Sequence, residues 1–239
     1  MTDRSDLKTF RWKGREGPFE LFLSDHTFAP SKVSELLAEA LELSGGETVI
    51  DMGCGSGVLS IVAARLGAGE VHGVDAAPDT VEIATLNAER LGVADRTHFY
   101  QGDLFDPLPR DLKADVIIGD VSGIPDPVAR VTGWFPSGRG GGPRGSELPI
   151  RMLREAPGWL KEGGKLLLPT GTLQDETSIL QVAKDLFGRL TKLVERQFPL
   201  PAVVAESQEV LALMKERVVE LTQRGSRLLW AARVWECTV

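Results

Sequence analysis

The stretch VIDMGCGSG at residues 49–57 decides the fold class of this sequence. Apolar residues lead into an acid, and glycines then follow at every second position, which is typical of a buried strand that turns into a helix. Such glycines allow a tight turn and let a ligand approach the backbone. The dinucleotide fingerprint is G-x-G-x-x-G, with a helix N-terminus directed at a pyrophosphate. Here the third glycine comes one residue early, which argues against a dinucleotide.

Two acids flank this glycine turn. Asp51 lies two residues before the first glycine, where a carboxylate would repel a pyrophosphate and attract a cation. Asp75 ends the next predicted strand, where a carboxylate can accept hydrogen bonds from both hydroxyls of a ribose. Together these features indicate a nucleoside with positive charge and no phosphate, which S-adenosylmethionine (SAM) fits. For the glycines alone, a close-packed turn without a ligand is the alternative interpretation.

Strands and helices alternate along the rest of the chain, which predicts an α/β fold with a mostly parallel sheet covered on both faces. Strands are predicted at residues 48–52, 70–75, 97–101, 114–120, 164–169, 191–198 and 227–239. Helices are predicted at 33–41, 58–67, 78–91, 147–160, 174–188 and 205–223. Ser31 has the character of a helix N-cap.

Composition places the sequence among single-domain globular proteins. The 239 residues are 42% hydrophobic and 26% charged, and we expect an N-terminal arm or lid (1–30) before one domain (31–239). Two cysteines, no leader-like apolar segment and no run of 18–20 apolar residues predict a cytoplasmic protein that does not enter a membrane. A net charge of −7 without a Lys/Arg run disfavours long nucleic acid as partner.

Residues 49–93, followed by FYQGDLF and ADVIIGD, closely resemble class I SAM-dependent methyltransferases. The segment 49–93 is similar to ribosomal-protein L11 and arginine methyltransferases. QGDLFDPLP (101–109) and the segment 139–171 are similar to the release-factor glutamine methyltransferase (HemK) branch. The resemblance covers roughly residues 28–170. It implies a Rossmann-like seven-stranded sheet whose last two strands form an antiparallel hairpin.

The resemblance also implies a set of cofactor-binding residues. Asp75 takes the ribose hydroxyls, Asp103 accepts from the adenine amino group and the amide of Leu104 meets a ring nitrogen. The segment Phe28–Ser31 matches the part of the family that folds over the cofactor. The full implied set is Asp51, Gly53, Cys54, Gly55, Gly57, Asp75, Ala76, Asp103, Leu104 and Asp120, with Cys54 as a small apolar filler.

The acceptor site departs from the HemK pattern. HemK-type enzymes end the fourth strand in Asn-Pro-Pro-Tyr, whereas this chain has Asp-Val-Ser-Gly at 120–123. Asp120 can hold a nucleophile or take its proton and Ser122 can donate to a substrate, so both are candidate catalytic residues. An irregular stretch at 120–146 follows. The candidate substrate contacts are His26, Trp134, Arg139 and Arg144, with the two arginines suited to a carboxylate.

The function expected from these observations is SAM-dependent methyl transfer to a small molecule of amino-acid-like or natural-product type, without a metal. One alternative is methylation of an amide or amine side chain of a protein. Another is a non-catalytic SAM-binding subunit, which the altered 120–123 motif keeps open. The glycine spacing disfavours an NAD-dependent oxidoreductase. The predicted helix at 205–223 is expected to cover the substrate or to form a dimer surface.

Overall fold

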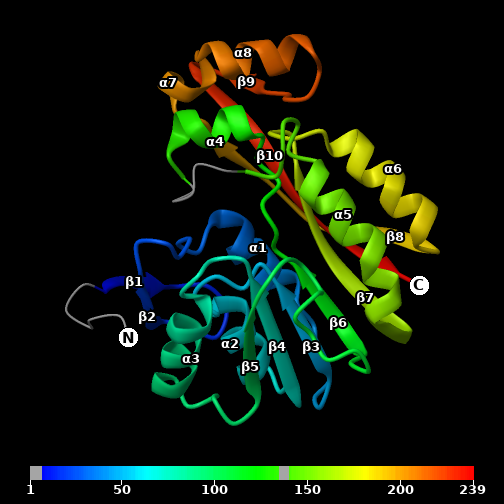
Figure 1. Ribbon diagram of the computed structural model, residues 1–239. Helices are drawn as coiled ribbons and strands as arrows, with labels where there is room; N and C mark the ends of the chain where they lie inside the picture. The colour runs from blue at the N-terminus through cyan, green and yellow to red at the C-terminus, as the bar shows by residue number, and fades with distance from the viewer. Residues whose placement is uncertain (1–6, 135–139) are drawn as a thin grey trace.

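The computed structural model describes residues 7–134 and 140–239, and its main feature is one large twisted sheet (Figure 1). The strand order along the sheet is β5-β4-β3-β6-β7-β10-β8. The bounds are β3 (Thr48–Met52), β4 (Glu70–Asp75), β5 (Thr97–Gln101), β6 (Ala114–Gly119), β7 (Leu160–Gly171), β8 (Arg189–Pro199) and β10 (Arg227–Thr238). Each predicted strand is therefore present, within a few residues of its predicted bounds.

The first five strands of this order run parallel, and β10 lies antiparallel between β7 and β8. The expected C-terminal antiparallel hairpin, β8 with β10, is confirmed. The strand order reverses at β3, which has β4 on one side and β6 on the other. Open α/β sheets bind ligands at such a reversal, beyond the carboxyl ends of the strands. The glycine turn at 53–57 follows β3 at that point.

Successive side chains of each strand point to opposite faces of the sheet, so the strands contribute to two separate cores. Val49, Val71 and Ile118 pack on one face with helices α1 (Lys32–Ala40) and α2 (Val58–Arg65). Ile50 and Val74 pack on the other face with α5 (Glu147–Glu155) and α6 (Glu176–Leu186). Helix α3 (Thr80–Arg90) lies beside β5. Among the helices of the described residues, none is both long and apolar enough to cross a bilayer.

The N-terminal arm is a β-hairpin, β1 (Lys8–Trp12) with β2 (Phe19–Leu23), and it is anchored to the domain. Trp12 and Leu21 are buried in the core of the α1–α2 face. The fully buried Asn87 of α3 exchanges two hydrogen bonds with the backbone of Phe22 and donates another to the Ser56 carbonyl at 2.9 Å. The hairpin is thus bound to the glycine turn through Asn87. Its division from the domain at residue 30 stays a prediction.

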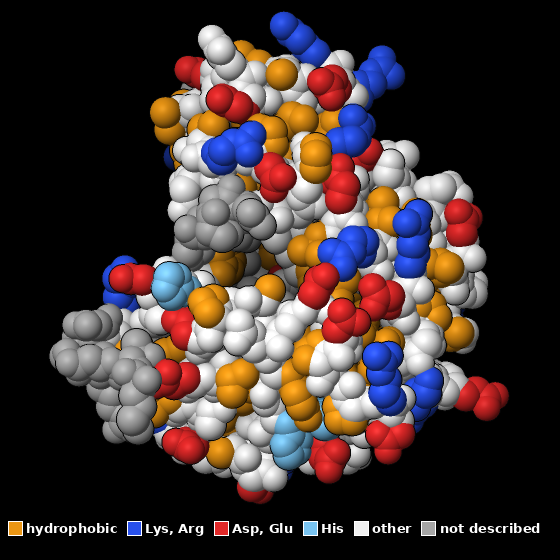
Figure 2. All heavy atoms as spheres, viewed as in Figure 1, with side chains coloured by type: hydrophobic (Ala, Val, Ile, Leu, Met, Phe, Trp, Pro, Cys, Tyr) orange, Lys and Arg blue, Asp and Glu red, His pale blue; other side chains and the backbone are white. Residues whose placement is uncertain are grey.

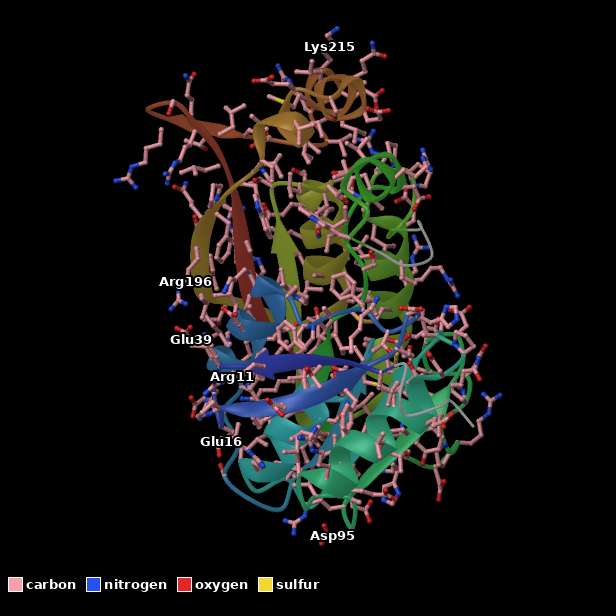
Figure 3. All side chains as sticks on the ribbon, turned by 90° about the vertical axis from the view of Figure 1, so that its left-hand side faces the viewer. Arg11, Glu16, Glu39, Asp95, Arg196 and Lys215 are labelled. Carbon is pink, nitrogen blue, oxygen red and sulfur yellow. The ribbon has the colours of Figure 1, made fainter. Side chains whose placement is uncertain are left out.

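Helix α1 begins at the predicted cap and is fixed at both ends. Ser31 is the N-cap and forms a capping box with Ser34. Arg15 of the hairpin donates to carbonyls at the C-terminal end of the helix. Glu39 of α1 and Arg196 of β8 point toward one another (Figure 3), and the distance from Arg196 Nη2 to Glu39 Oε2 is 2.8 Å. Because α1 is held in this way, the side chains of its first turn have fixed places at the sheet edge.

The predicted helix at 205–223 is wrong. The chain instead forms α7 (Ala202–Ala205), α8 (Gln208–Lys215) and strand β9 (Thr222–Arg224), which pairs with β10. Ser207 interrupts the helix because its side chain accepts from the Val210 amide as the N-cap of α8. Arg217 then takes a positive φ of 58°, which ends the helical path.

The stretch 120–146 contains a helix that the sequence analysis missed, α4 (Asp126–Thr132). Helices α4, α7 and α8 share a third core that includes Val128, Leu173 and Val210. We call residues 126–132 and 200–224 the cap. Figure 1 shows the cap at one end of the sheet, with α4 beside α7 and α8. It stands beyond the last residues of β7, since Leu173 belongs to its core.

The glycines of 140–145 serve chain packing. A Cβ at Gly141 would lie 2.3 Å from the Ser122 carbonyl oxygen, and one at Gly145 would lie 2.4 Å from that of Gly123. The Gly141 amide donates to the Ile124 carbonyl at 2.7 Å, so the two segments run in backbone contact. The glycine run therefore fixes the path of the chain that follows β6.

Candidate functional site

A cavity of about 890 Å³ lies at the reversal of strand order, beyond β3, β4 and β6. Figure 2 shows the surface hollowed between the part that carries the cap and the part that carries α3. The cavity is lined by residues that fall into two halves. The half at the glycine turn contains Phe28, Gly53, Cys54, Gly55, Asp75, Ala76, Asp103 and Leu104. The half at the cap contains Ser122, Ile124, Trp134, Leu148, Leu173, Gln174 and Trp230, and Asp120 lies between the two.

The glycine turn brings three backbone segments together. The amides of Gly53 and Cys54 both donate to the Val74 carbonyl, at 2.8 and 3.0 Å, which closes the turn against β4. Gly53 has a φ of +83°, and a Cβ there would lie 2.4 Å from the Asp120 carbonyl oxygen. Only glycine permits this approach of β3 to the end of β6.

Asp75 is held by the backbone of the turn. Its Oδ2 accepts from the Gly55 amide and its Oδ1 from the Ala77 amide, each at 2.9 Å. A carboxylate offers about four lone pairs. Two remain for a ligand, and the side chain is oriented before the ligand arrives. The geometry suits a vicinal diol, which presents two hydroxyl donors side by side.

Asp51 and Asp120 are carboxyl groups with raised pKa values. Burial, opposed by a hydrogen bond from Ser60, raises the pKa of Asp51 to about 7. Burial also raises the pKa of Asp120 to about 6, with a contribution from the charge of Asp75. The Ser34 hydroxyl of α1 donates to Asp120 Oδ2 at 2.8 Å. A cationic ligand near these groups would stabilise their charged forms.

Asp51 lies beneath the cavity and does not line it. Its side chain is fully buried, Oδ2 accepts from Ser60 at 2.6 Å and Oδ1 has no hydrogen-bond partner. The Asp51 carboxyl group is therefore separated from the cavity by the residues of its wall. Gly57 also lies off the cavity wall, where it starts α2 with a φ of +80°.

Asp103 and Leu104 lie on the wall where the resemblance implies an adenine. Leu104 takes a positive φ of +47°, an uncommon conformation for a branched residue, which the turn after β5 imposes. Asp103 accepts from Arg151 of α5 at 2.7 Å, and both side chains are more than half exposed. Burial raises the pKa of the Cys54 thiol, which fits an apolar filler better than a nucleophile.

Arg144, one of the two arginines expected to bind a carboxylate, does not line the cavity. Arg144 donates to Asp175 at 2.9 Å and pairs with Glu216 at 3.5 Å, so it joins the β7–α6 connection to the cap. The helix start beside it is already filled, because the Glu147 carboxylate accepts from the amides of Arg144 and Ser146. The expectation for Arg144 is therefore wrong. Arg139 lies outside the described residues.

The remaining predicted substrate residues lie at the cavity. His26 is exposed at its rim and Trp134 is 37% exposed beside the cap half, and the candidate catalytic residue Ser122 lines that half. The sequence analysis missed Ser34, Trp230 and Gln174, which also line the cavity. Gln174 follows the carboxyl end of β7, so the same rule that selected Asp120 would have selected it.

The cavity carries the charge that a cationic nucleoside requires. Its acids are Asp75, Asp103 and Asp120, while the basic side chains of its described lining are His26 and Lys32, and Lys32 pairs with Glu35. The glycine cradle points to the same ligand class. In the described part of the chain, no group of three or more His, Cys, Asp or Glu side chains is arranged to hold a metal ion.

Asp75→Ala is expected to weaken SAM binding by roughly 1.5–3 kcal/mol, the usual contribution of a hydrogen bond to a charged group. The physical reason is the loss of the oriented acceptor for the ribose diol. Calorimetric titration of the full chain with SAM measures the change, with circular dichroism to verify the fold. Unchanged affinity would mean that the ribose is held elsewhere.

The chain matches a family model over part of its length. Residues 34–125 match the family described as ribosomal protein L11 methyltransferase (PrmA). A curated L11 methyltransferase of Escherichia coli (strain 55989 / EAEC) is 43% identical over 83 residues, which are 35% of this chain and 27% of that protein. The chain thus spans about a quarter of the length of the curated relatives it matches.

Solved structures resemble the fold over nearly the whole chain. A ribosomal protein L11 methylase of Lactobacillus delbrueckii subsp. bulgaricus aligns with a TM-score of 0.57 at 17% identity, covering 89% of this chain and 82% of that one. A 16S rRNA N2 G1207 methyltransferase of T. thermophilus, in complex with AdoMet and guanosine, aligns with a TM-score of 0.60 at 16% identity, covering 95% and 50%.

These likenesses agree with the glycine turn, the strand order and the acidic cavity. The expected seven-strand path with its C-terminal hairpin is the arrangement found here. The chain has the Rossmann-like fold of class I methyltransferases, and its residues 34–125 match the family model described as ribosomal protein L11 methyltransferase (PrmA).

Proposed function

We propose that this protein binds SAM and transfers its methyl group to a side chain of a protein. SAM supplies an already activated methyl group, so the protein must bind SAM and the acceptor, orient them toward one another and exclude water. Asp75 and the glycine turn would hold the nucleoside, with Asp103 and Leu104 beside the adenine. Asp120 would hold the acceptor and receive its proton.

The observation that carries this proposal is the extent of the family match. It runs from α1 to residue 125 and so includes Asp120 and Ser122 at the end of β6, beyond the residues that would hold the cofactor. Curated relatives that match 83 residues of the chain are named for a ribosomal protein. A protein acceptor therefore has better support than the small molecule expected from the sequence. A dimer, a metal-free reaction and the cytoplasmic location stay predictions.

A labelling experiment tests the proposal. The full chain is incubated with SAM carrying a labelled methyl group, once with a protein extract and once with the small-molecule fraction of the same cells. We expect label in protein, and mass spectrometry then gives the modified residue. Label only in small molecules would overturn the acceptor assignment. SAM binding without any transfer would indicate a non-catalytic subunit, and NAD binding without SAM binding would overturn the cofactor.

SAM affinity is expected to rise with pH between about 5 and 8. Because folding raises the pKa of Asp51 and Asp120 to about 7 and about 6, the free folded chain holds protons that the unfolded chain has already lost above pH 4. The stability of the free chain therefore falls as pH rises through this window. A bound cation favours the charged carboxylates, so SAM binding should release protons.

Titration of the chain with SAM in two buffers of different ionisation enthalpy measures that proton release. We expect the affinity to gain at most about tenfold per pH unit for each carboxylate. In Asp120→Asn the part of the dependence near pH 6 should disappear, while Asp111→Asn, an exposed acid away from the cavity, should change nothing. Proton uptake on binding would contradict this prediction.

A further inference from the structure

The cap half of the cavity contains polar groups that no described residue satisfies. Ser122 Oγ and Gln174 Nε2 are buried and have no hydrogen-bond partner, and only 8% of Gln174 is exposed. The lining residue Ser56 also has an unpaired hydroxyl, but it belongs to the glycine turn. Thr170, at the end of β7, is already bonded to Glu176 and Trp235. Buried polar groups without partners are costly, so those in a cavity wall indicate a ligand group.

Ser122 and Gln174 belong to one small region. A Cβ built at Gly123 would lie within 2.4–3.2 Å of the side-chain amide atoms of Gln174, so the glutamine packs against the residue next to Ser122. The neighbour of Gln174, Asp175, is held by Arg144, and its amide donates to the Arg144 carbonyl at 3.0 Å. The cap connection thus fixes Gln174 beside the loop that begins at Asp120.

We propose that Ser122 and Gln174 bind a neutral carbonyl oxygen of the methyl acceptor, close to the nitrogen that Asp120 holds. This inference rests on the proposed function and specifies its acceptor. Ser122 offers one hydroxyl donor and the Gln174 amide offers two N–H donors. Asp120 supplies the acceptor for an N–H of the same group.

The charge of the cavity selects a carbonyl over a carboxylate. Three acids line it, of which Asp103 pairs with Arg151, while its described basic lining residues are His26 and Lys32, the latter paired with Glu35. Arg144, which would neutralise an anion, is paired outside it. A carboxylate would be repelled there, whereas a neutral carbonyl oxygen accepts the same hydrogen bonds without that repulsion. Trp134 and Trp230 add apolar walls that suit the aliphatic part of a polypeptide. The carbonyl can come from a peptide backbone or from a side-chain carboxamide.

The test is a binding titration of the full chain saturated with S-adenosylhomocysteine (SAH). The probes are N-acetyl-alanyl-glutaminyl-alanine amide, N-acetyl-trialanine amide and n-butylammonium, which has no carbonyl. We expect both peptides to bind. Tighter binding of the glutamine peptide assigns the carbonyl to a side-chain carboxamide, and equal binding assigns it to the backbone.

Four variants separate a donor role from a structural one. Ser122→Ala and Gln174→Leu should each weaken peptide binding by about 2- to 10-fold, and leave butylammonium unaffected. Gln174→Glu keeps the shape but removes the donors, so it should weaken peptide binding at least as much as Gln174→Leu. Gln181→Leu, the same change on the exposed side of α6, should have no effect.

The outcomes distinguish this inference from the proposed function. SAH affinity measured in every variant verifies that the cofactor half is intact. A chain that fails to bind SAH refutes the proposed function and the inference with it. If the chain binds SAH, three results overturn the inference alone. The peptides do not bind, the variants bind the peptides with unchanged affinity, or Gln174→Glu binds them as tightly as the unaltered chain.

Discussion

Asp120→Ala is expected to lower the methyl-transfer rate by about 10²–10⁴-fold, the usual contribution of a positioned acid or base. Asp120 ends β6 between the two halves of the cavity, and Ser34 occupies its Oδ2 at 2.8 Å. Oδ1 is left for the acceptor. SAM affinity should change far less than the rate, because Asp75 and the glycine turn stay in place.

Asp120→Asn distinguishes a base from a positioning group. The amide keeps the shape of the side chain and an oxygen acceptor but does not take a proton near neutral pH. A base would lose most of its rate in this variant, whereas a positioning group would lose much less. The rate of the unaltered chain should rise through pH 6, because burial raises the pKa of Asp120 to about that value.

Ser34→Ala provides an independent readout of the same carboxyl group. The Ser34 hydroxyl stabilises the charged form, so its removal should raise the pKa of Asp120 further and shift the pH–rate profile upward. Steady-state rates between pH 5 and 8, with Asp111→Asn as control, measure both effects. If Asp120→Ala abolishes SAM binding, or leaves the rate unchanged, the acceptor site lies elsewhere along 121–146.

The sheet and the cofactor half could be predicted because their signals are local. The mostly apolar runs of β3 and β4 predict strands of a parallel sheet covered on both faces, and the glycine spacing predicts the turn. Asp75, Gly53 and Asp120 follow strands whose carboxyl ends meet at one edge. Their positions in the sequence therefore predict that these residues lie close together.

The cap could not be predicted in the same way. Its helices are short, and α4 and α8 join through a core whose buried members lie up to 91 residues apart in sequence, as Val128 and Val219 do. The apolar residues at 205–223 have helical spacing, yet Ser207 and Arg217 break the helix. Tertiary packing, and not the helical spacing of the apolar residues, therefore determines where the helix ends.

Arg144 and Gln174 illustrate the limits of assigning roles by residue type. An arginine beside glycines suggested an anion site, but Asp175 and Glu216 neutralise it from segments that only the fold brings near. Gln174 has no charge and belongs to no motif, so beyond its place after β7 it is marked by its burial without a partner. Whether a polar group has a hydrogen-bond partner depends on the folded chain and cannot be deduced from the residue type.

Gly53→Ala is expected to be the most damaging single change at the cofactor half. A left-handed conformation costs an alanine about 1–2 kcal/mol. The 2.4 Å approach of its Cβ to the Asp120 carbonyl oxygen adds an overlap with backbone, of the kind that costs about 1–3 kcal/mol. The matched control is Gly92→Ala, since Gly92 has a φ of +72° and no atom within 4 Å of its Cβ position.

In Gly92→Ala the free energy of unfolding should therefore fall only by the cost of the left-handed conformation, and the affinity for SAH should stay the same. Gly53→Ala should unfold at clearly lower urea concentration than the control. It should also bind SAH at least about tenfold more weakly, because relief of the overlap moves the end of β6, and Asp120 with it, away from the turn. Urea unfolding and calorimetry on the two variants measure both effects. Equal stability and equal SAH affinity in the pair would show that β3 and β6 do not need this close approach, and that the turn is free to bind the cofactor without it.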